Sequence, residues 1–256
     1  YKVRYLSDVG CSHDCKYCYA KSLLSFRGLW NPKNPSVANV EKLKRKIDKL
    51  RKGTIVRLGG MTDCFQPIEL DNRITYKIIK YLNKRRIGYL IVTKSSIVAN
   101  DEYLKIYDKD LAHFQITVTT TDDSKSVKYE KATVPSKRIE AIEKLYKNGF
   151  DVQVRLSPFI YEYIDFDILN NIKCNKILIE FLRVNHWIKQ WFDIDYSKYT
   201  VKHAGYEHLP LSIKKQYLQK ITGFEQISVC EDVDEHFEYW KSNINHNKKD
   251  CCNLGG

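Results

Sequence analysis

Long apolar runs are absent from this 256-residue sequence. None approaches the roughly 20 consecutive apolar residues that a helix needs to cross a bilayer, so we expect no membrane-spanning segment. The sequence also shows no signal-peptide pattern, no internal repeat and no low-complexity segment. What remains is a chain long enough for one large α/β domain with a sizeable core.

Acidic residues are scarce relative to basic ones. The sequence has 31 Asp and Glu against 43 Lys and Arg, which gives a net charge of +12. Such a charge attracts a polyanionic partner, for example a nucleic acid. The basic residues also fit solvated faces, as on a helix predicted over 36–52, where Val40, Leu43 and Ile47 face inward and lysines face outward. Both interpretations remain open.

Three of the eight cysteines, Cys11, Cys15 and Cys18, stand at the spacing C-x3-C-x2-C. Three thiolates on one loop can hold three irons of a four-iron cluster and leave the fourth iron open. Zinc is the other metal that thiolates favour, but a structural zinc needs a fourth ligand, for which His13 is the local candidate. Clustered cysteines of this kind are typical of a reducing compartment, so we expect a cytoplasmic protein.

Apolar patterning predicts alternating strands and helices. Strands are expected at 2–7, 54–58, 89–92, 113–120, 151–157 and 176–182, and helices at 36–52, 71–86, 101–109 and 135–148. This order predicts a parallel sheet covered by helices. Polar residues alternate with apolar ones in the strands at 113–120 and 151–157, which is unexpected for strands buried on both faces. We therefore predict an open, partial (β/α)6 barrel over residues 1–183, with a wet lumen that holds a polar ligand.

The carboxyl ends of the predicted strands carry the candidate site, because parallel barrels place their chemistry there. A double glycine at a strand end lets the backbone approach a ligand closely. The residues that gather at these ends are the cysteine loop, Gly59, Gly60, Lys94, Thr119, Arg155 and Glu180.

Residues 184–256 are predicted to be a small C-terminal extension that covers the active site, with helices near 212–222 and 233–242 and a strand at 227–230. Aromatic residues between 187 and 206 either stack on bases or form a small core of their own. Cys230, Cys251 and Cys252 fit a second metal site, a redox pair, a group that acts on substrate, or structural thiols.

The cysteine loop, with Tyr17 before the last cysteine, resembles the loop C-x3-C-x-aromatic-C of the radical SAM family. This resemblance implies that Cys11, Cys15 and Cys18 ligate a [4Fe-4S] cluster whose open iron chelates S-adenosylmethionine. An electron from a reductant such as flavodoxin or ferredoxin then yields a 5′-deoxyadenosyl radical, which abstracts hydrogen from a substrate. The implied cofactor-binding residues are Tyr17 near the adenine, Gly59, Gly60, Met61 and Thr62 along the methionine, and Lys94, Thr119 and Arg155.

The segments CKYCY, GGMTDCFQPIE, VTKS, ITVTTTDD and RLSP resemble the spore photoproduct lyase family, which repairs a thymine dimer in DNA. The resemblance implies a hydrogen-transfer role for Tyr19. The cysteine that donates hydrogen in that family is replaced here by Met61, and Cys64 is either a substitute donor or a plain buried thiol.

We therefore expect a lyase- or transferase-type enzyme that acts on a nucleic acid or nucleotide other than the thymine dimer. Two alternatives stay open. One is a radical SAM enzyme that modifies a peptide or small molecule, and the other is a zinc-containing nucleic-acid-binding module.

Overall fold

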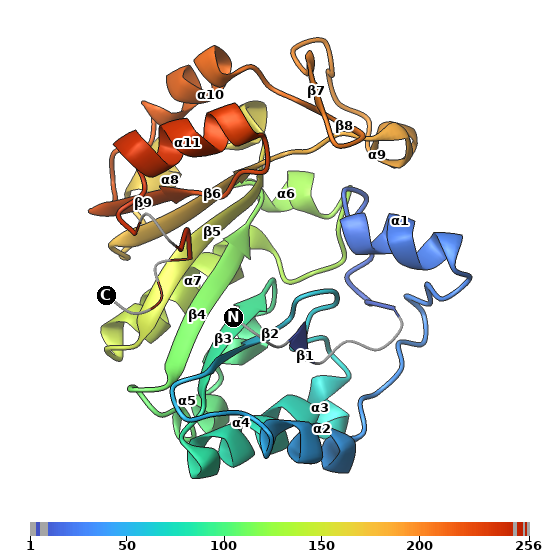
Figure 1. The fold of residues 1–256 in the computed structure, drawn as a ribbon, viewed down its shortest axis with the longest axis vertical. Helices are drawn as coiled ribbons and strands as arrows, with labels where there is room; N and C mark the ends of the chain where they lie inside the picture. Colours follow the sequence, from blue (N-terminus) through green and yellow to red (C-terminus); the bar gives the residue numbers. More distant parts are fainter. Residues whose placement is uncertain (1–3, 6–9, 248–249, 253, 255–256) are drawn as a thin grey trace.

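The computed structural model describes residues 4–5, 10–247, 250–252 and 254, and a parallel sheet runs through its centre (Figure 1). The sheet has seven strands in the order β1-β2-β3-β4-β5-β6-β9. Every neighbouring pair in it is parallel. The strands are β1 (Arg4–Tyr5), β2 (Ile55–Leu58), β3 (Gly88–Thr93), β4 (Ala112–Val118), β5 (Asp151–Phe159), β6 (Lys176–Phe181) and β9 (Gln226–Val229). The predicted α/β class with a parallel, partial-barrel sheet is thus confirmed.

Helices cover the outer side of the sheet, where α4 (Ile74–Arg85) packs on β3 and α7 (Pro135–Lys147) packs on β4 and β5. Before β5 the other helices are α1 (Tyr19–Phe26), α2 (Val40–Ile47), α3 (Glu69–Asn72), η1 (Ser96–Ala99), α5 (Asp101–Leu104) and α6 (Asp123–Ser126). After β5 they are η2 (Tyr161–Tyr163), α8 (Phe166–Asn170), α9 (His186–Trp191), α10 (Leu211–Leu218) and α11 (Asp234–Asn243). None of the described helices has the length and apolar character required to cross a membrane.

Three helical predictions were wrong in detail. The helix expected from residue 36 begins only at Val40, because Asn39 caps it by accepting the backbone N–H of Lys42 at 2.9 Å. The helix expected over 71–86 is divided into α3 and α4 by Arg73, whose φ of 55° is left-handed. The helix expected over 101–109 ends at Leu104.

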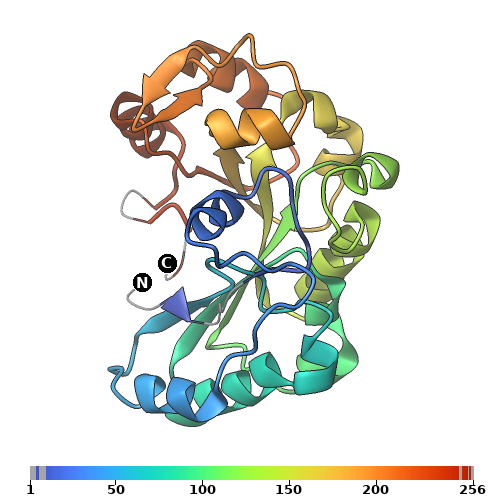
Figure 2. The ribbon, with the colours of Figure 1, turned by 90° about the vertical axis from the view of Figure 1, so that its right-hand side faces the viewer.

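The C-terminal part adds to the same sheet. Strand β9, predicted at 227–230, pairs with β6 at the edge of the sheet, and α10 and α11 lie near it at the top of Figure 1. The short hairpin β7 (Val201–His203) and β8 (Tyr206–His208) lies apart from the sheet in both ribbon views (Figure 2). The predicted domain boundary between residues 183 and 184 remains a prediction. One strand of the predicted C-terminal extension, β9, belongs to the main sheet.

The inner face of β4 and β5 is polar, as predicted. Gln115, Thr117 and Gln153 are each no more than 2% exposed, and Arg155 is 8% exposed. The side chain of Gln115 accepts from Arg155 Nη1 at 2.8 Å and donates to Gln153 at 3.3 Å. These bonds satisfy polar groups that would otherwise be costly to bury.

Candidate active site

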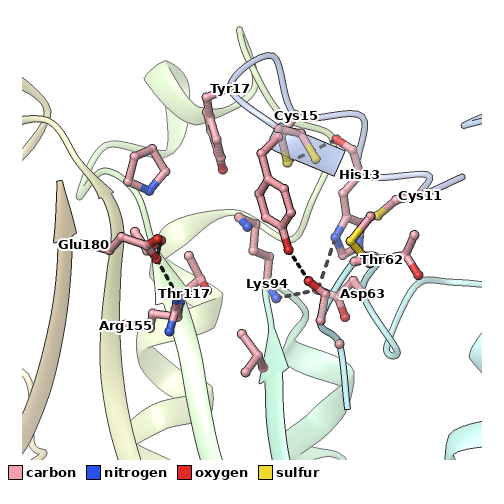
Figure 3. A pocket seen from close by; sticks show the side chains of 18 of the residues that line it. Cys11, His13, Cys15, Tyr17, Thr62, Asp63, Lys94, Thr117, Arg155 and Glu180 are labelled. Carbon is pink, nitrogen blue, oxygen red and sulfur yellow. Dashed lines mark hydrogen bonds and ion pairs between the residues drawn. The ribbon is translucent and has the colours of Figure 1, made fainter. Parts of the chain in front are cut away.

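A cavity of about 440 Å³ lies at the carboxyl ends of the strands (Figure 3). It brings together the cysteine loop from before α1, the Gly-rich turn after β2, Lys94 after β3 and Arg155 in β5. These segments are remote in sequence, but parallel strands place their carboxyl ends at one edge. The predicted location of the site is therefore where the structure has a cavity.

The thiols of Cys11, Cys15 and Cys18 all line this cavity. Two tight turns build their loop, since the N–H of Asp14 donates to Cys11 O at 3.1 Å and the N–H of Cys18 donates to Cys15 O at 3.2 Å. The three sulfurs do not all lie within 4.8 Å of one another, since the trio is not among the described groups of ligand atoms that meet this limit. A single zinc ion needs sulfurs about 3.8 Å apart, given Zn–S bonds of about 2.3 Å, so the wider spacing fits a multi-iron cluster better.

Burial raises the pKa of Cys11 to about 12 and the pKa of Cys15 well above its usual value. A thiolate ligand in such surroundings needs a neighbouring positive charge, which a bound metal supplies. Lys94 is the cation of the chain that lowers the pKa of Cys15 against this burial.

Tyr17 anchors the loop from below. Its hydroxyl donates to the buried carboxylate of Glu130, which also lies 3.8 Å from Cys15 Sγ. Glu130 in turn pairs with Arg138 of α7 and accepts from Thr119 Oγ1 at 3.1 Å. The ring of Tyr17 faces Lys94, whose Nζ lies 5.6 Å from the ring centroid. Tyr17 thus lines the cavity with a fixed ring, as an adenine contact requires.

Asp63 ties the loop to the strand ends, and sequence analysis missed it. Its carboxylate accepts the N–H of Lys94 and the hydroxyl of Thr93, both at 2.7 Å, and lies 3.4 Å from Nδ1 of His13. Burial by itself would raise the pKa of Asp63, but His13 and these hydrogen bonds lower it to about 2. Its position three residues after the double glycine at a strand end was the available signal.

The Gly-rich turn approaches β3 closely. Gly59 has a φ of +83°, and a Cβ there would lie 2.1 Å from the carbonyl oxygen of Val92. The hydroxyl of Tyr19 donates to the carbonyl oxygen of Gly60. Gly59, Gly60, Met61 and Thr62 all line the cavity, so the structure brings the predicted methionine-binding turn to the cysteines.

Two predicted site residues do not line the cavity. Cys64 is buried in the hydrophobic core and does not line the cavity, which fits a plain buried thiol better than a hydrogen donor. Thr119 follows the last residue of β4, so its side chain leaves the alternation and bonds Tyr129 and Glu130 instead. It is Thr117 of the strand that lines the cavity.

Arg155 lines the cavity, but its charge is already matched. Its Nη2 donates to Glu180 Oε2 at 2.5 Å, and Arg183 donates to the other oxygen of Glu180 at 2.5 Å. Burial would raise the pKa of Glu180, and the two arginines lower it to about 2. Arg155 is therefore held in place for contact with a ligand, with little charge to spare for a carboxylate.

Arg57 and Trp30 also line the cavity and were not predicted. Their Nε and Nε1 atoms are buried and have no hydrogen-bond partner within the described part of the chain. A buried donor without a partner is costly, and a bound ligand would relieve that cost. Arg57 alternates with apolar neighbours in β2, which was the signal that could have revealed it.

The aromatic residues after 183 include both buried and exposed rings. Phe192 is buried, and its ring packs against Tyr17 and Tyr129 at centroid distances of 5.8 and 5.4 Å. Trp187, by contrast, is 44% exposed and stacks on Trp191 at 5.7 Å.

Comparison with known proteins explains this geometry. The profile of the Radical SAM superfamily matches residues 7–170, which is most of the chain. The chain belongs to the radical SAM superfamily. Members of this superfamily use a [4Fe-4S] cluster and S-adenosylmethionine, and the three loop thiols at the cavity fit such a cluster. The zinc interpretation of this loop is correspondingly disfavoured.

One relative is the "Uncharacterized protein MJ0683" of Methanocaldococcus jannaschii, which is 30% identical over 210 residues, 77% of this chain and 78% of that protein. Among solved structures, a spore photoproduct lyase variant with bound AdoMet and dinucleoside spore photoproduct gives a TM-score of 0.62 at 15% identity, covering 93% of this chain and 73% of the other. Streptococcus suis SuiB bound to S-adenosylmethionine gives 0.56 at 12% identity, covering 92% and 51%. At these identities the two structures show a common fold.

Proposed function

We propose that this radical SAM enzyme acts on a nucleic acid or nucleotide, in DNA repair or modification. The observation that carries the proposal is a pair of buried donors in the wall of the cavity, Arg57 Nε and Trp30 Nε1, which have no hydrogen-bond partner among the described residues. A nucleotide offers phosphate oxygens to a guanidinium and a base to an indole ring.

Two further observations support a polyanionic substrate. The chain carries a net charge of +12. A spore photoproduct lyase structure of the same fold holds a dinucleoside photoproduct, which is a nucleic-acid fragment. Both observations support a nucleic acid or nucleotide as the substrate. The reaction type, lyase or transferase, rests on the likeness to spore photoproduct lyase alone.

We assign the parts of the site as follows. Cys11, Cys15 and Cys18 hold the cluster, which, with S-adenosylmethionine bound, supplies a 5′-deoxyadenosyl radical for hydrogen abstraction. Tyr17 bounds the adenine side, and Lys94 offers its ammonium to the methionine carboxylate. The turn from Gly59 to Thr62 presents backbone groups to the methionine moiety.

Tyr19 completes this assignment from the outer side of the Gly-rich turn. Its hydroxyl bonds the carbonyl oxygen of Gly60, and its side chain is half exposed at the mouth of the cavity. This bond and this exposure support a role for Tyr19 in holding the turn and meeting the substrate. Cys64 lies outside the cavity wall, so a hydrogen-donor role for it would require a rearrangement of the core.

The cofactor chemistry is tested by anaerobic reconstitution with iron and sulfide, followed by dithionite and S-adenosylmethionine. We expect 5′-deoxyadenosine, and we expect Cys15→Ala to abolish it while Cys174→Ala, a buried cysteine remote from the loop, retains it. If Cys15→Ala still formed 5′-deoxyadenosine, as Cys174→Ala should, the assignment of the loop would be contradicted.

The substrate class is tested with DNA and RNA made from deuterated nucleotides. We expect transfer of deuterium into 5′-deoxyadenosine, since the substrate is the hydrogen source. Arg57→Met should weaken oligonucleotide binding about tenfold, as expected for a lost charge-assisted contact. Arg51→Met removes the same charge from an exposed position and should change binding little.

A second candidate, modification of a peptide or small molecule, is favoured by the size of the cavity. Its volume of about 440 Å³ lies within the range of ordinary small-molecule sites, of about 300–1,000 Å³, and S-adenosylmethionine occupies part of it. Deoxyadenosine that never carries deuterium from any DNA or RNA would support this candidate over the first.

A further inference from the structure

Three cysteines outside the radical SAM loop meet beside the cavity. Cys230 directly follows β9, and its side chain lines the cavity. Cys251 and Cys252 come from a turn some 20 residues further along the chain. The thiol of Cys251 is in hydrogen-bonding contact with those of both Cys230 and Cys252. The fold thus unites thiols from two segments that have no sequence motif in common.

The turn that carries Cys251 and Cys252 is fixed to the polar face of the sheet. Gln153 Nε2 of β5 donates to the carbonyl oxygen of Cys252 at 2.5 Å. Asp250 accepts the backbone N–H groups of Cys252 and Leu254, both at 3.0 Å. Figure 1 shows this segment, in red, beside β4 and β5. The thiols are therefore positioned by hydrogen bonds that do not involve the sulfur atoms.

Three of the four donor atoms are close enough for a single ion. One carboxylate oxygen of Asp250 and the sulfurs of Cys251 and Cys252 all lie within 4.8 Å of one another. Tetrahedral zinc with Zn–S bonds of about 2.3 Å brings its ligand sulfurs to about 3.8 Å, so small side-chain rotations suffice. Cys230 lies outside this group and adjoins it through its contact with Cys251, so its side chain must turn toward the ion.

A cationic side chain, Arg155, lies near all three cysteines. Soft thiolates select zinc over magnesium or calcium.

We propose that Cys230, Cys251 and Cys252, with Asp250 as the fourth ligand, bind one zinc ion that links the C-terminal turn to the edge of the sheet at the cavity. The site is separate from the radical SAM cluster and does not depend on the substrate proposed above. Because Cys230 lines the cavity, the ion would form part of the wall that encloses the substrate.

Cobalt(II) titration tests the proposal in the full-length chain carrying Cys11→Ser, Cys15→Ser and Cys18→Ser, so that the cluster loop takes up no metal. We expect one equivalent of cobalt, a thiolate-to-cobalt charge-transfer band, and displacement by zinc. Cys230→Ser or Cys251→Ser in this background should weaken binding at least tenfold. Cys174→Ser is the matched control and should leave it unchanged, since Cys174 is a buried thiol that contacts Val152 O at 3.2 Å.

If the triple variant does not fold, zinc is measured per chain in the reconstituted wild-type enzyme and in its Cys230→Ser and Cys174→Ser variants. Zinc that is lost in Cys230→Ser but kept in the wild type and in Cys174→Ser would support the site. Absence of bound metal, binding that survives Cys251→Ser, or uptake of iron and sulfide at these cysteines would overturn it. Deoxyadenosine formation is scored separately, so failure here leaves the radical SAM assignment intact.

Discussion

Glu130 and Arg138 form an ion pair in which neither side chain is exposed to solvent. The pair lies directly beneath the cluster loop, because Glu130 also accepts from Tyr17 and approaches Cys15 Sγ to 3.8 Å. Arg138 further donates to the carbonyl oxygen of Thr117 at 3.0 Å. The loop that holds the cluster is thus supported by a charge pair between the segment after α6 and helix α7.

Arg138→Met should destabilise the protein by about 3–5 kcal/mol, because it leaves the carboxylate of Glu130 buried without its cation. The measurement is the free energy of unfolding in urea. Lys137→Met is the control one residue away, since Lys137 pairs with Glu140 on the surface and should cost no more than about 1 kcal/mol. Equal losses in the two variants would show that Glu130 does not depend on Arg138.

Gly59→Ala should be more damaging than Gly53→Ala. Both glycines have a φ near +84°, so both substitutions carry the left-handed backbone cost of about 1–2 kcal/mol. A Cβ at position 59 also meets the carbonyl oxygen of Val92 at 2.1 Å, whereas one at position 53 meets nothing within 4 Å. We expect Gly59→Ala alone to lower S-adenosylmethionine affinity, measured by calorimetry on the reconstituted enzyme. If Gly53→Ala lowered the affinity as much as Gly59→Ala, the close approach of Gly59 to Val92 would not be the cause.

Local sequence patterns predicted the parts of the site that lie on short segments. The cysteine spacing, the double glycine after a strand and the alternation around Gln115 and Arg155 each depend on a few neighbouring residues. The cavity confirms that these parts meet. Thr119 was misplaced because it follows the last residue of β4, where the regular alternation of side-chain directions ends.

The partnerships across the sheet were beyond sequence reasoning. Tyr17 and Glu130 are 113 residues apart, and nothing in either segment indicates the other. Sequence analysis grouped Cys230 with Cys251, but no local pattern shows how they meet. They become neighbours because β9 adds to β6 and the C-terminal turn folds back onto β5. Such contacts follow from topology, which one sequence without relatives specifies only in outline.

Lys94→Met should weaken binding of S-adenosylmethionine about 10- to 100-fold, as expected for the loss of a charge-assisted bond worth roughly 1.5–3 kcal/mol. The ammonium lies at the cavity beside Tyr17, and the backbone N–H of Lys94, which bonds Asp63, is kept in the variant. Equilibrium dialysis of the reconstituted enzyme measures the effect. Lys21→Met is the control, since Lys21 pairs with Asp14 at 3.2 Å and does not line the cavity. An affinity unchanged by Lys94→Met would remove Lys94 from the cofactor site.

Glu180→Gln should change how stability depends on pH. The pKa of Glu180 is lowered to about 2 in the folded protein from an ordinary value of 4.5, so its ionised form stabilises the fold above about pH 4.5. That contribution, at most about 3 kcal/mol from the size of the shift, is lost as the pH falls toward 2.

The wild-type advantage over Glu180→Gln in urea unfolding should therefore be largest near pH 7 and shrink steadily below pH 4.5. Glu162→Gln supplies the comparison, because Glu162 is an exposed carboxylate paired with Lys198 at 3.3 Å, and its difference from wild type should stay within about 1 kcal/mol. A constant difference for Glu180→Gln between pH 7 and pH 3 would mean that Arg155 and Arg183 do not hold this carboxylate ionised. The guanidinium of Arg155 would then be available to an anionic ligand, which is the role that we assign to Arg57.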